Sequence, residues 1–200
     1  MADRIALESL PFALSWQGEP VECGTGHDSL WIEAGPETDL FVDPGTEVEY
    51  LDAPRLVGQV RGDFTLAARV SADFGATFDA GVLLLWAGGG RWAKLCLEFS
   101  PQGKPTVVSV VTRGVSDDCN SFAIRGDDVW LRVARLGAAF AFHTSLDGRD
   151  WELIRHFSLE AGTELFVGFL VQSPRGPGCV ARFDEISFAP TRLADIRSGE

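Results

Sequence analysis

The sequence predicts an all-β protein, a two-sheet antiparallel sandwich that forms a single domain. Three features point to it: many short apolar or alternating segments, turns rich in Gly, Pro and Asp between them, and no long stretch of clean helical periodicity. Many short strands separated by such turns are typical of a sandwich or a barrel. The length of 200 residues suits one such domain.

Eleven segments have the composition of strands, since Val, Phe, Leu and Trp suit a pleated and half-buried surface. They are Ser29–Glu33, Leu56–Val60, Phe64–Val70, Ala80–Trp86, Trp92–Phe99, Thr106–Arg113, Val129–Arg135, Phe140–Ser145, Trp151–Phe157, Leu165–Gln172 and Cys179–Phe188. Turn sequences at Ala87–Gly90, Pro101–Lys104, Leu136–Ala138 and Asp147–Gly148 predict hairpins between consecutive strands.

We expect residues 1–189 to form the sandwich and residues 190–200 to be a polar C-terminal tail. Gly114–Asp128 is polar and longer than a hairpin connection requires, which predicts a long loop. Such a loop is either a functional rim or a plain surface connection, and both interpretations stay open.

The formal net charge of −12 argues against nucleic acid and against an anionic membrane surface as partners. No apolar run approaches the roughly 18 residues that cross a bilayer. The N-terminal segment lacks the pattern of a secretory signal peptide, so we expect a cytoplasmic protein.

No metal site or cofactor is predicted. Cys23, Cys96, Cys119 and Cys179 contain no CxxC pair, and the three histidines lack metal-binding spacing. A cytoplasmic chain is also not expected to form disulfides. Cys96 and Cys179 fit core positions in apolar strands, whereas Cys119 lies in a polar segment and is the cysteine expected at the surface.

The predicted strand Trp92–Phe99 has two unlike faces. Its odd-numbered positions are uniformly apolar and should face the core, while Trp92, Lys94 and Glu98 share the other face. An aromatic plate beside polar groups is how proteins hold sugars, because CH groups stack on the ring and the hydroxyls are hydrogen-bonded. The alternative is a solvated outer face with an ion pair, which stabilises a fold by at most about 1 kcal/mol.

Several segments carry a resemblance to a known family. They are Phe78–Leu84, Trp92–Leu95 with Glu98, Val108–Gly114 with Ser116 and Asp117, and Ser145–Gly148 with Trp151 and Arg155. Over roughly Phe12 to Phe188 the chain resembles uncharacterised bacterial and fungal proteins related to the fungal regulation-of-enolase protein. The resemblance implies a jelly-roll sandwich similar to the concanavalin A-like lectins and glucanases, with the ligand on the concave sheet.

On that sheet the resemblance places a ligand site. Trp92 would stack on the ligand. Lys94, Glu98 and Arg113 would form hydrogen bonds with the polar groups of the ligand. The rim of the site would consist of Asp117, Asp118 and Asn120. Much of the family has a Trp soon after the Ser-Asp pair, but this chain continues with Asp118, Cys119 and Asn120. We therefore expect a more polar rim. The spacing of these acids matches no known calcium loop.

The carboxylate motif of glucanases with this fold, E-x-D-x-x-E, is incomplete. Glu37 and Asp39 begin it, but Val42 occupies the third position. The leading hypothesis is a non-catalytic domain that binds a carbohydrate or sugar-like metabolite. The alternatives are an enzyme acting on a sugar derivative, with Glu98 and Asp117 as acid and base, and a regulatory domain of carbohydrate metabolism that binds a protein partner.

Overall fold

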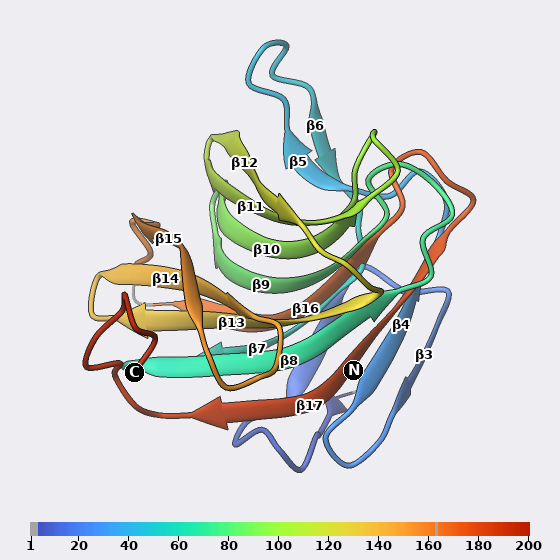
Figure 1. Ribbon diagram of the computed structural model, residues 1–200. Coiled ribbons are helices and arrows are strands. Elements are labelled where there is room, and N and C mark those ends of the chain that lie inside the picture. Colours follow the sequence, from blue (N-terminus) through green and yellow to red (C-terminus); the bar gives the residue numbers. More distant parts are fainter. Residues whose placement is uncertain (1–3, 163) are drawn as a thin grey trace.

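The computed structural model describes residues 4–162 and 164–200, and all regular structure in that part of the chain is β-strand. Two antiparallel sheets pack face to face, and a separate two-stranded hairpin projects beyond them (Figure 1). The predicted fold class is therefore confirmed. No helix in the described residues is long and apolar enough to cross a membrane.

Sheet A has eight strands, and all neighbouring pairs are antiparallel. Their order is β1 (Arg4–Ile5), β2 (Leu14–Gln17), β7 (Arg55–Val60), β16 (Leu165–Gln172), β9 (Ala80–Gly88), β10 (Arg91–Phe99), β11 (Pro105–Arg113) and β12 (Val115–Ala123).

Sheet B has seven strands, in the order β15 (Glu152–Ser158), β14 (Ala139–Ser145), β13 (Asp128–Leu136), β8 (Phe64–Ala72), β17 (Cys179–Ala189), β4 (Leu30–Ala34) and β3 (Glu22–Thr25). The projecting hairpin consists of β5 (Leu40–Val42) and β6 (Glu49–Leu51).

All eleven predicted strands are present with shifted ends, and the four predicted turns each join an antiparallel pair. The loop prediction for Gly114–Asp128 was wrong, because most of that segment forms β12, the edge strand of sheet A. An edge strand with one pairing partner tolerates polar residues on its solvated side, so hydrophobic periodicity did not reveal it.

The main core lies between the sheets. On β10 the apolar odd-numbered positions, such as Leu95 and Leu97, are fully buried there, as strand alternation predicts. Phe169 of sheet A and Phe183 of sheet B meet at 4.9 Å between ring centroids. Continuous apolar packing of this kind holds the two sheets together and fixes which face of sheet A points outward.

The outer face of sheet A, which points away from sheet B, has its own apolar cluster. Leu40 and Val42 of β5 are buried against Val82, Leu84 and other residues of this face. The hairpin therefore covers one end of the outer face and leaves the remainder open.

The C-terminal segment, predicted to be a polar tail, packs on the outer face of sheet B. Leu193 and Ile196 contact buried residues of β13 and β14. Arg132 donates to the Gly199 carbonyl at 2.7 Å, and His143 Nε2 lies 2.8 Å from the Ile196 carbonyl. Burial lowers the pKa of His143 to about 4, so this imidazole is neutral at physiological pH.

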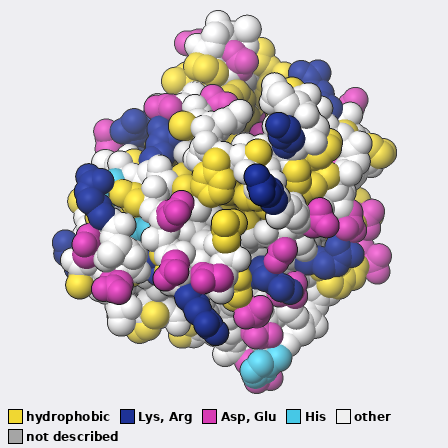
Figure 2. All heavy atoms as spheres, in the orientation of Figure 1, with side chains coloured by type: hydrophobic (Ala, Val, Ile, Leu, Met, Phe, Trp, Pro, Cys, Tyr) yellow, Lys and Arg dark blue, Asp and Glu magenta, His cyan; other side chains and the backbone are white. Residues whose placement is uncertain are grey.

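Cys96 and Cys179 are buried and Cys119 is exposed, as predicted. On the face seen in Figure 2, Lys and Arg side chains are interspersed with Asp and Glu. That face consequently presents no single basic patch.

Candidate functional site

A cavity of about 550 Å³ opens on the outer face of sheet A. Its volume is within the range of small-molecule sites. Residues of β10, β11, β12 and β16, of the β5–β6 hairpin and of the neighbouring loops line it: Glu37, Asp39, Phe41, Asp43, Tyr50, Phe78, Lys94, Glu98, Val108, Val110, Asp118, Gln172, Pro174 and Arg175.

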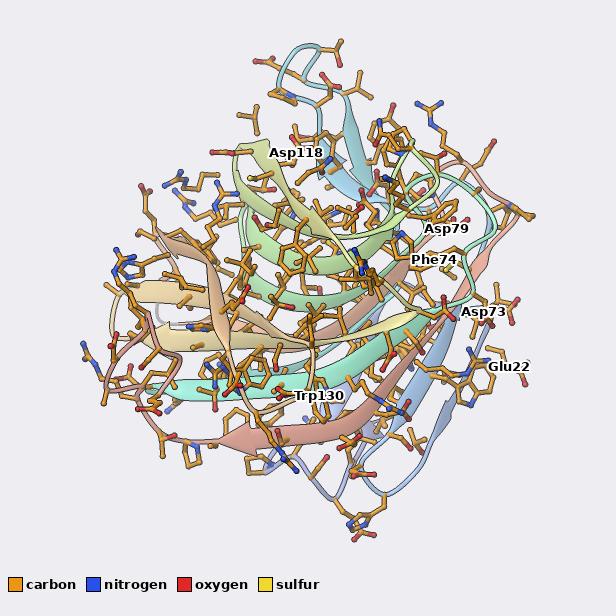
Figure 3. The ribbon with its side chains drawn as sticks, in the orientation of Figure 1. Glu22, Asp73, Phe74, Asp79, Asp118 and Trp130 are labelled. Carbon is orange, nitrogen blue, oxygen red and sulfur yellow. The ribbon has the colours of Figure 1, made fainter. Side chains whose placement is uncertain are left out.

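Strand register determines the floor of the cavity. Lys94 of β10 pairs with Val110 of β11, which pairs with Asp118 of β12, so these three side chains form one row on the outer face. Glu98 lies four positions along β10 on the same face. Lys94 and Glu98 therefore share one face of β10, and Asp118, which Figure 3 labels on β12, lines the same cavity.

Lys94 is the polar centre of the cavity, although only 1% of its surface is exposed. Its ammonium group donates to Gln172 Oε1 at 2.9 Å and pairs with Asp39 Oδ1 at 3.4 Å. No third acceptor contacts the ammonium group within the described residues. One N–H is therefore free to bond a ligand, since a lysine ammonium carries three donors.

Phe78 borders the cavity with a strained backbone. Its φ of +72° is rare for a bulky residue. Its amide donates to the Phe99 carbonyl at 2.8 Å, and its carbonyl accepts from Gln172 Nε2 at 3.2 Å. Glu37, at φ +56°, is a second non-glycine residue of this kind on the cavity wall. Such conformations cost about 1–3 kcal/mol each and cluster at binding sites.

A buried carboxylate next to Phe78 stabilises that conformation. Asp79 accepts hydrogen bonds from the amides of Gly75 and Ala76 at 2.8 Å and from Ser173 Oγ at 2.7 Å (Figure 3). These bonds hold the loop before β9 against the end of β16. The aromatic wall of the cavity is therefore preorganised for a ligand.

Glu98 has the most altered acidity in the cavity. Its pKa is raised to about 7, mainly by burial; the positive charge of Lys94 opposes this rise, and the negative charges of Asp39 and Asp118 add to it. At neutral pH both the protonated and the ionised form are populated. Glu98 can therefore either donate or accept a hydrogen bond.

The β5–β6 hairpin supplies the roof. Val42 donates its amide to Ser116 Oγ of β12 at 2.9 Å, which fixes the turn end of β5 over sheet A. Phe41 pairs with Tyr50 across the hairpin, and both rings line the cavity. The Phe41 ring centroid lies 6.0 Å from Lys94 Nζ, at the limit of a cation–π contact.

The role predicted for Trp92 is not supported by its position. Only 2% of the residue is exposed, and its ring stacks on Trp86 at 5.5 Å between centroids. Trp92 is on the predicted face, but it packs in the apolar cluster that includes Leu40 and Val42 of β5. A buried ring cannot stack on a ligand, and the covering hairpin was missed because its strands are three residues long.

The structure does not support the predicted pairing of Glu98 with Asp117 as acid and base, because Asp117 does not line the cavity. Asp117 points to the opposite face of β12 from Asp118 and forms an ion pair with Arg155 of sheet B at 3.0 Å. Arg113 is exposed at the end of β11, and Asn120 is exposed on β12. Neither lines the cavity. Of the predicted residues, Lys94, Glu98 and Asp118 are brought together.

The remaining lining residues were not predicted as site residues. Glu37 and Asp39 had been considered only as the start of an incomplete glucanase motif. Their acidic side chains just before a short apolar segment were the available signal. Gln172 and Phe78 reach the cavity through register and loop geometry, which a single sequence does not specify. Among the described residues, no group of His, Cys, Asp or Glu is arranged to hold a metal ion.

Solved structures share this architecture. A functionally unknown protein from Saccharomyces cerevisiae is 22% identical, with a TM-score of 0.83 over 90% of this chain and 97% of its own. A xylan β-1,4-xylosidase from Bacillus halodurans C-125 is 12% identical, with a TM-score of 0.62 over 86% of this chain and 38% of its own. An alginate lyase from Klebsiella pneumoniae is 13% identical, with a TM-score of 0.54 over 83% and 82% of the two chains.

At these identities the likeness shows the fold alone. No curated protein matches the sequence. Neither the family description nor the three structures described above mentions enolase, so that part of the resemblance stays a prediction. Residues 16–191 match the family described as a protein of unknown function, DUF1349. Because the match spans most of the sequence, the chain belongs to the DUF1349 family.

Proposed function

We propose that this protein is a binding domain for a carbohydrate or a sugar-like metabolite, which it holds in the cavity on the outer face of sheet A. One observation carries the proposal. The same cavity combines the aromatic rings of Phe41, Tyr50 and Phe78 with the hydrogen-bonding groups of Lys94 and Gln172. Sugars need both, because their CH faces pack on rings and their hydroxyls require donors and acceptors.

The central polar network suits hydroxyl recognition. Lys94 is held by Gln172 and Asp39, so little side-chain entropy remains to be lost on binding. The structural relatives add support at the level of the fold, since the xylosidase and the alginate lyase are named for action on polysaccharides.

A glycan array with neutral, amino and acidic sugars tests this proposal, followed by calorimetry on the strongest binders. Tyr50→Ala removes a ring from the rim and should weaken binding at least fivefold. Leu51→Ala is the matched control, because Leu51 is the next residue of β6, is similarly exposed and lies outside the cavity. The proposal fails if no glycan binds, or if both variants bind as tightly as the unmodified protein.

A second candidate, catalysis on a sugar derivative, is favoured by the protonation state of Glu98. A carboxyl group in a cavity with a pKa of about 7 can act as a general acid at neutral pH. Turnover of a glycan that binds, lost in Glu98→Gln while the affinity persists, would support this role. Equal turnover by the two proteins would exclude it.

A further inference from the structure

The charges that line the cavity do not balance. Lys94 is neutralised by Asp39 at 3.4 Å. Four other acidic side chains line the wall without an ion pair within 4 Å among the described residues: Glu37, Asp43, Asp118 and the partly ionised Glu98. Arg175 is the single lining cation outside the Lys94 pair, again counting described residues only. A concave site with an excess of one sign concentrates ligands of the opposite sign.

Arg175 lies near the open end of the β5–β6 hairpin, away from its turn. It follows Ser173 by two residues, and Ser173 exchanges backbone hydrogen bonds with Thr38 at 3.1 and 3.2 Å. Glu37, next to Thr38, therefore shares this end with Arg175. The guanidinium and carboxylate charges at this end offset one another.

Near the turn of the hairpin, the cavity holds carboxylates with no lining cation beside them among the described residues. Asp43 directly follows Val42, whose amide bonds Ser116 Oγ at 2.9 Å. Asp118 lies two residues beyond Ser116 on the same face of β12, near the contact with the turn end of β5 (Figure 3). These two acids consequently border one end of the cavity, together with the ring of Tyr50.

Asp43 is fixed in its charged form. Its Oδ1 accepts hydrogen bonds from the amides of Gly45 and Thr46, both at 2.8 Å. These bonds hold the pKa of Asp43 below its ordinary value. Anionic oxygens beside aromatic faces form the chemical environment that recognises an ammonium group.

We propose that the ligand of this cavity is a cationic saccharide, such as an amino sugar, whose ammonium group binds between Asp43 and Asp118 while its ring lies over the apolar floor. The inference rests on the proposed carbohydrate-binding function and names the class of sugar. Uronic acids and phosphosugars would meet the unpaired carboxylates and be repelled.

Four trisaccharides with different charges test the proposal. Calorimetry at pH 6, where the amines of the probe are protonated, compares chitosan triose, N,N′,N″-triacetylchitotriose, cellotriose and trigalacturonate. We expect chitosan triose to bind at least tenfold more tightly than cellotriose. The difference should shrink in 0.5 M salt, because exposed charges are screened there to a few ångströms.

A pair of variants on one strand locates the ammonium group. Asp118→Asn should reduce the preference for chitosan triose over cellotriose at least threefold. Asp117→Asn is the matched control, since Asp117 is adjacent but points to the other face of β12, and it should leave the preference unchanged.

The outcomes separate the two proposals. Equal or tighter binding of cellotriose or trigalacturonate overturns the cationic ligand and leaves carbohydrate binding standing. Equal effects of the two variants likewise overturn the placement at Asp118. If none of the four sugars binds, the proposed function fails and the inference falls with it.

Discussion

Replacing Glu98 by Gln should remove a pH-dependent loss of stability from the protein. In the folded state, burial holds the pKa of Glu98 at about 7, against 4.5 for the ordinary side chain. The unfolded chain therefore releases this proton at a lower pH than the folded chain does. The stabilising contribution is fully present below about pH 4.5 and is lost as the pH rises through 7.

The magnitude follows from the two pKa values. At about 1.4 kcal/mol for each pH unit, the rise from 4.5 to about 7 corresponds to at most about 3 kcal/mol. Glu98 keeps partial solvent contact, which screens the effect. We therefore expect the free energy of unfolding of the native protein to fall by about 1–3 kcal/mol relative to Glu98→Gln between pH 4.5 and 8.5.

Urea denaturation of the two proteins at half-unit steps over this pH range measures the difference directly. Subtracting one curve from the other cancels the titration of groups that both proteins share. The difference should change most steeply between pH 5 and 7. Two parallel curves would show that Glu98 ionises alike in the folded and unfolded chains, and the reasoning from burial would be refuted.

Three further substitutions test how the site is built. Lys94→Met leaves Asp39 without its buried partner, and we expect urea denaturation to show a loss of about 2–4 kcal/mol. Ser116→Ala removes the acceptor of the Val42 amide at the turn end of β5, so hydrogen exchange of that amide should accelerate while the core amides keep their rates. Gly168→Ala places a methyl group against the backbone of β7, and the protein should lose several kcal/mol of stability or fail to fold; a melting temperature near that of the native protein would contradict this contact.

The sequence revealed the long strands because their apolar alternation is set by the local chain. β10 is the clearest case, since its inward positions are uniformly apolar and its outward positions include Lys94 and Glu98. Both residues lie on the face that alternation predicts, and the structure adds that this face carries the cavity. Alternation thus identifies the face of a strand, and it does so without knowledge of the neighbouring strands.

Other parts of the site depend on contacts between distant segments. The β5–β6 hairpin is held by Val42 and Ser116, which are 74 residues apart, and it turns Trp92 from a predicted ligand platform into a packed residue. Gln172 reaches Lys94 across 78 residues of sequence. Contacts between residues so far apart in the sequence produce no local pattern, so a single sequence could not predict them.

Nuclear magnetic resonance on the ¹⁵N-labelled protein, titrated with the tightest glycan from the array, would report where the ligand binds. If the glycan binds in the cavity, the amide resonances of Lys94, Val110 and Asp118, on three adjacent strands of sheet A, should change their chemical shifts in proportion to the fraction of protein bound. The chemical shifts of the Arg132 and His143 amides, in sheet B, should stay unchanged. Shifts confined to sheet B, or none at saturating glycan, would contradict a carbohydrate site on the outer face of sheet A.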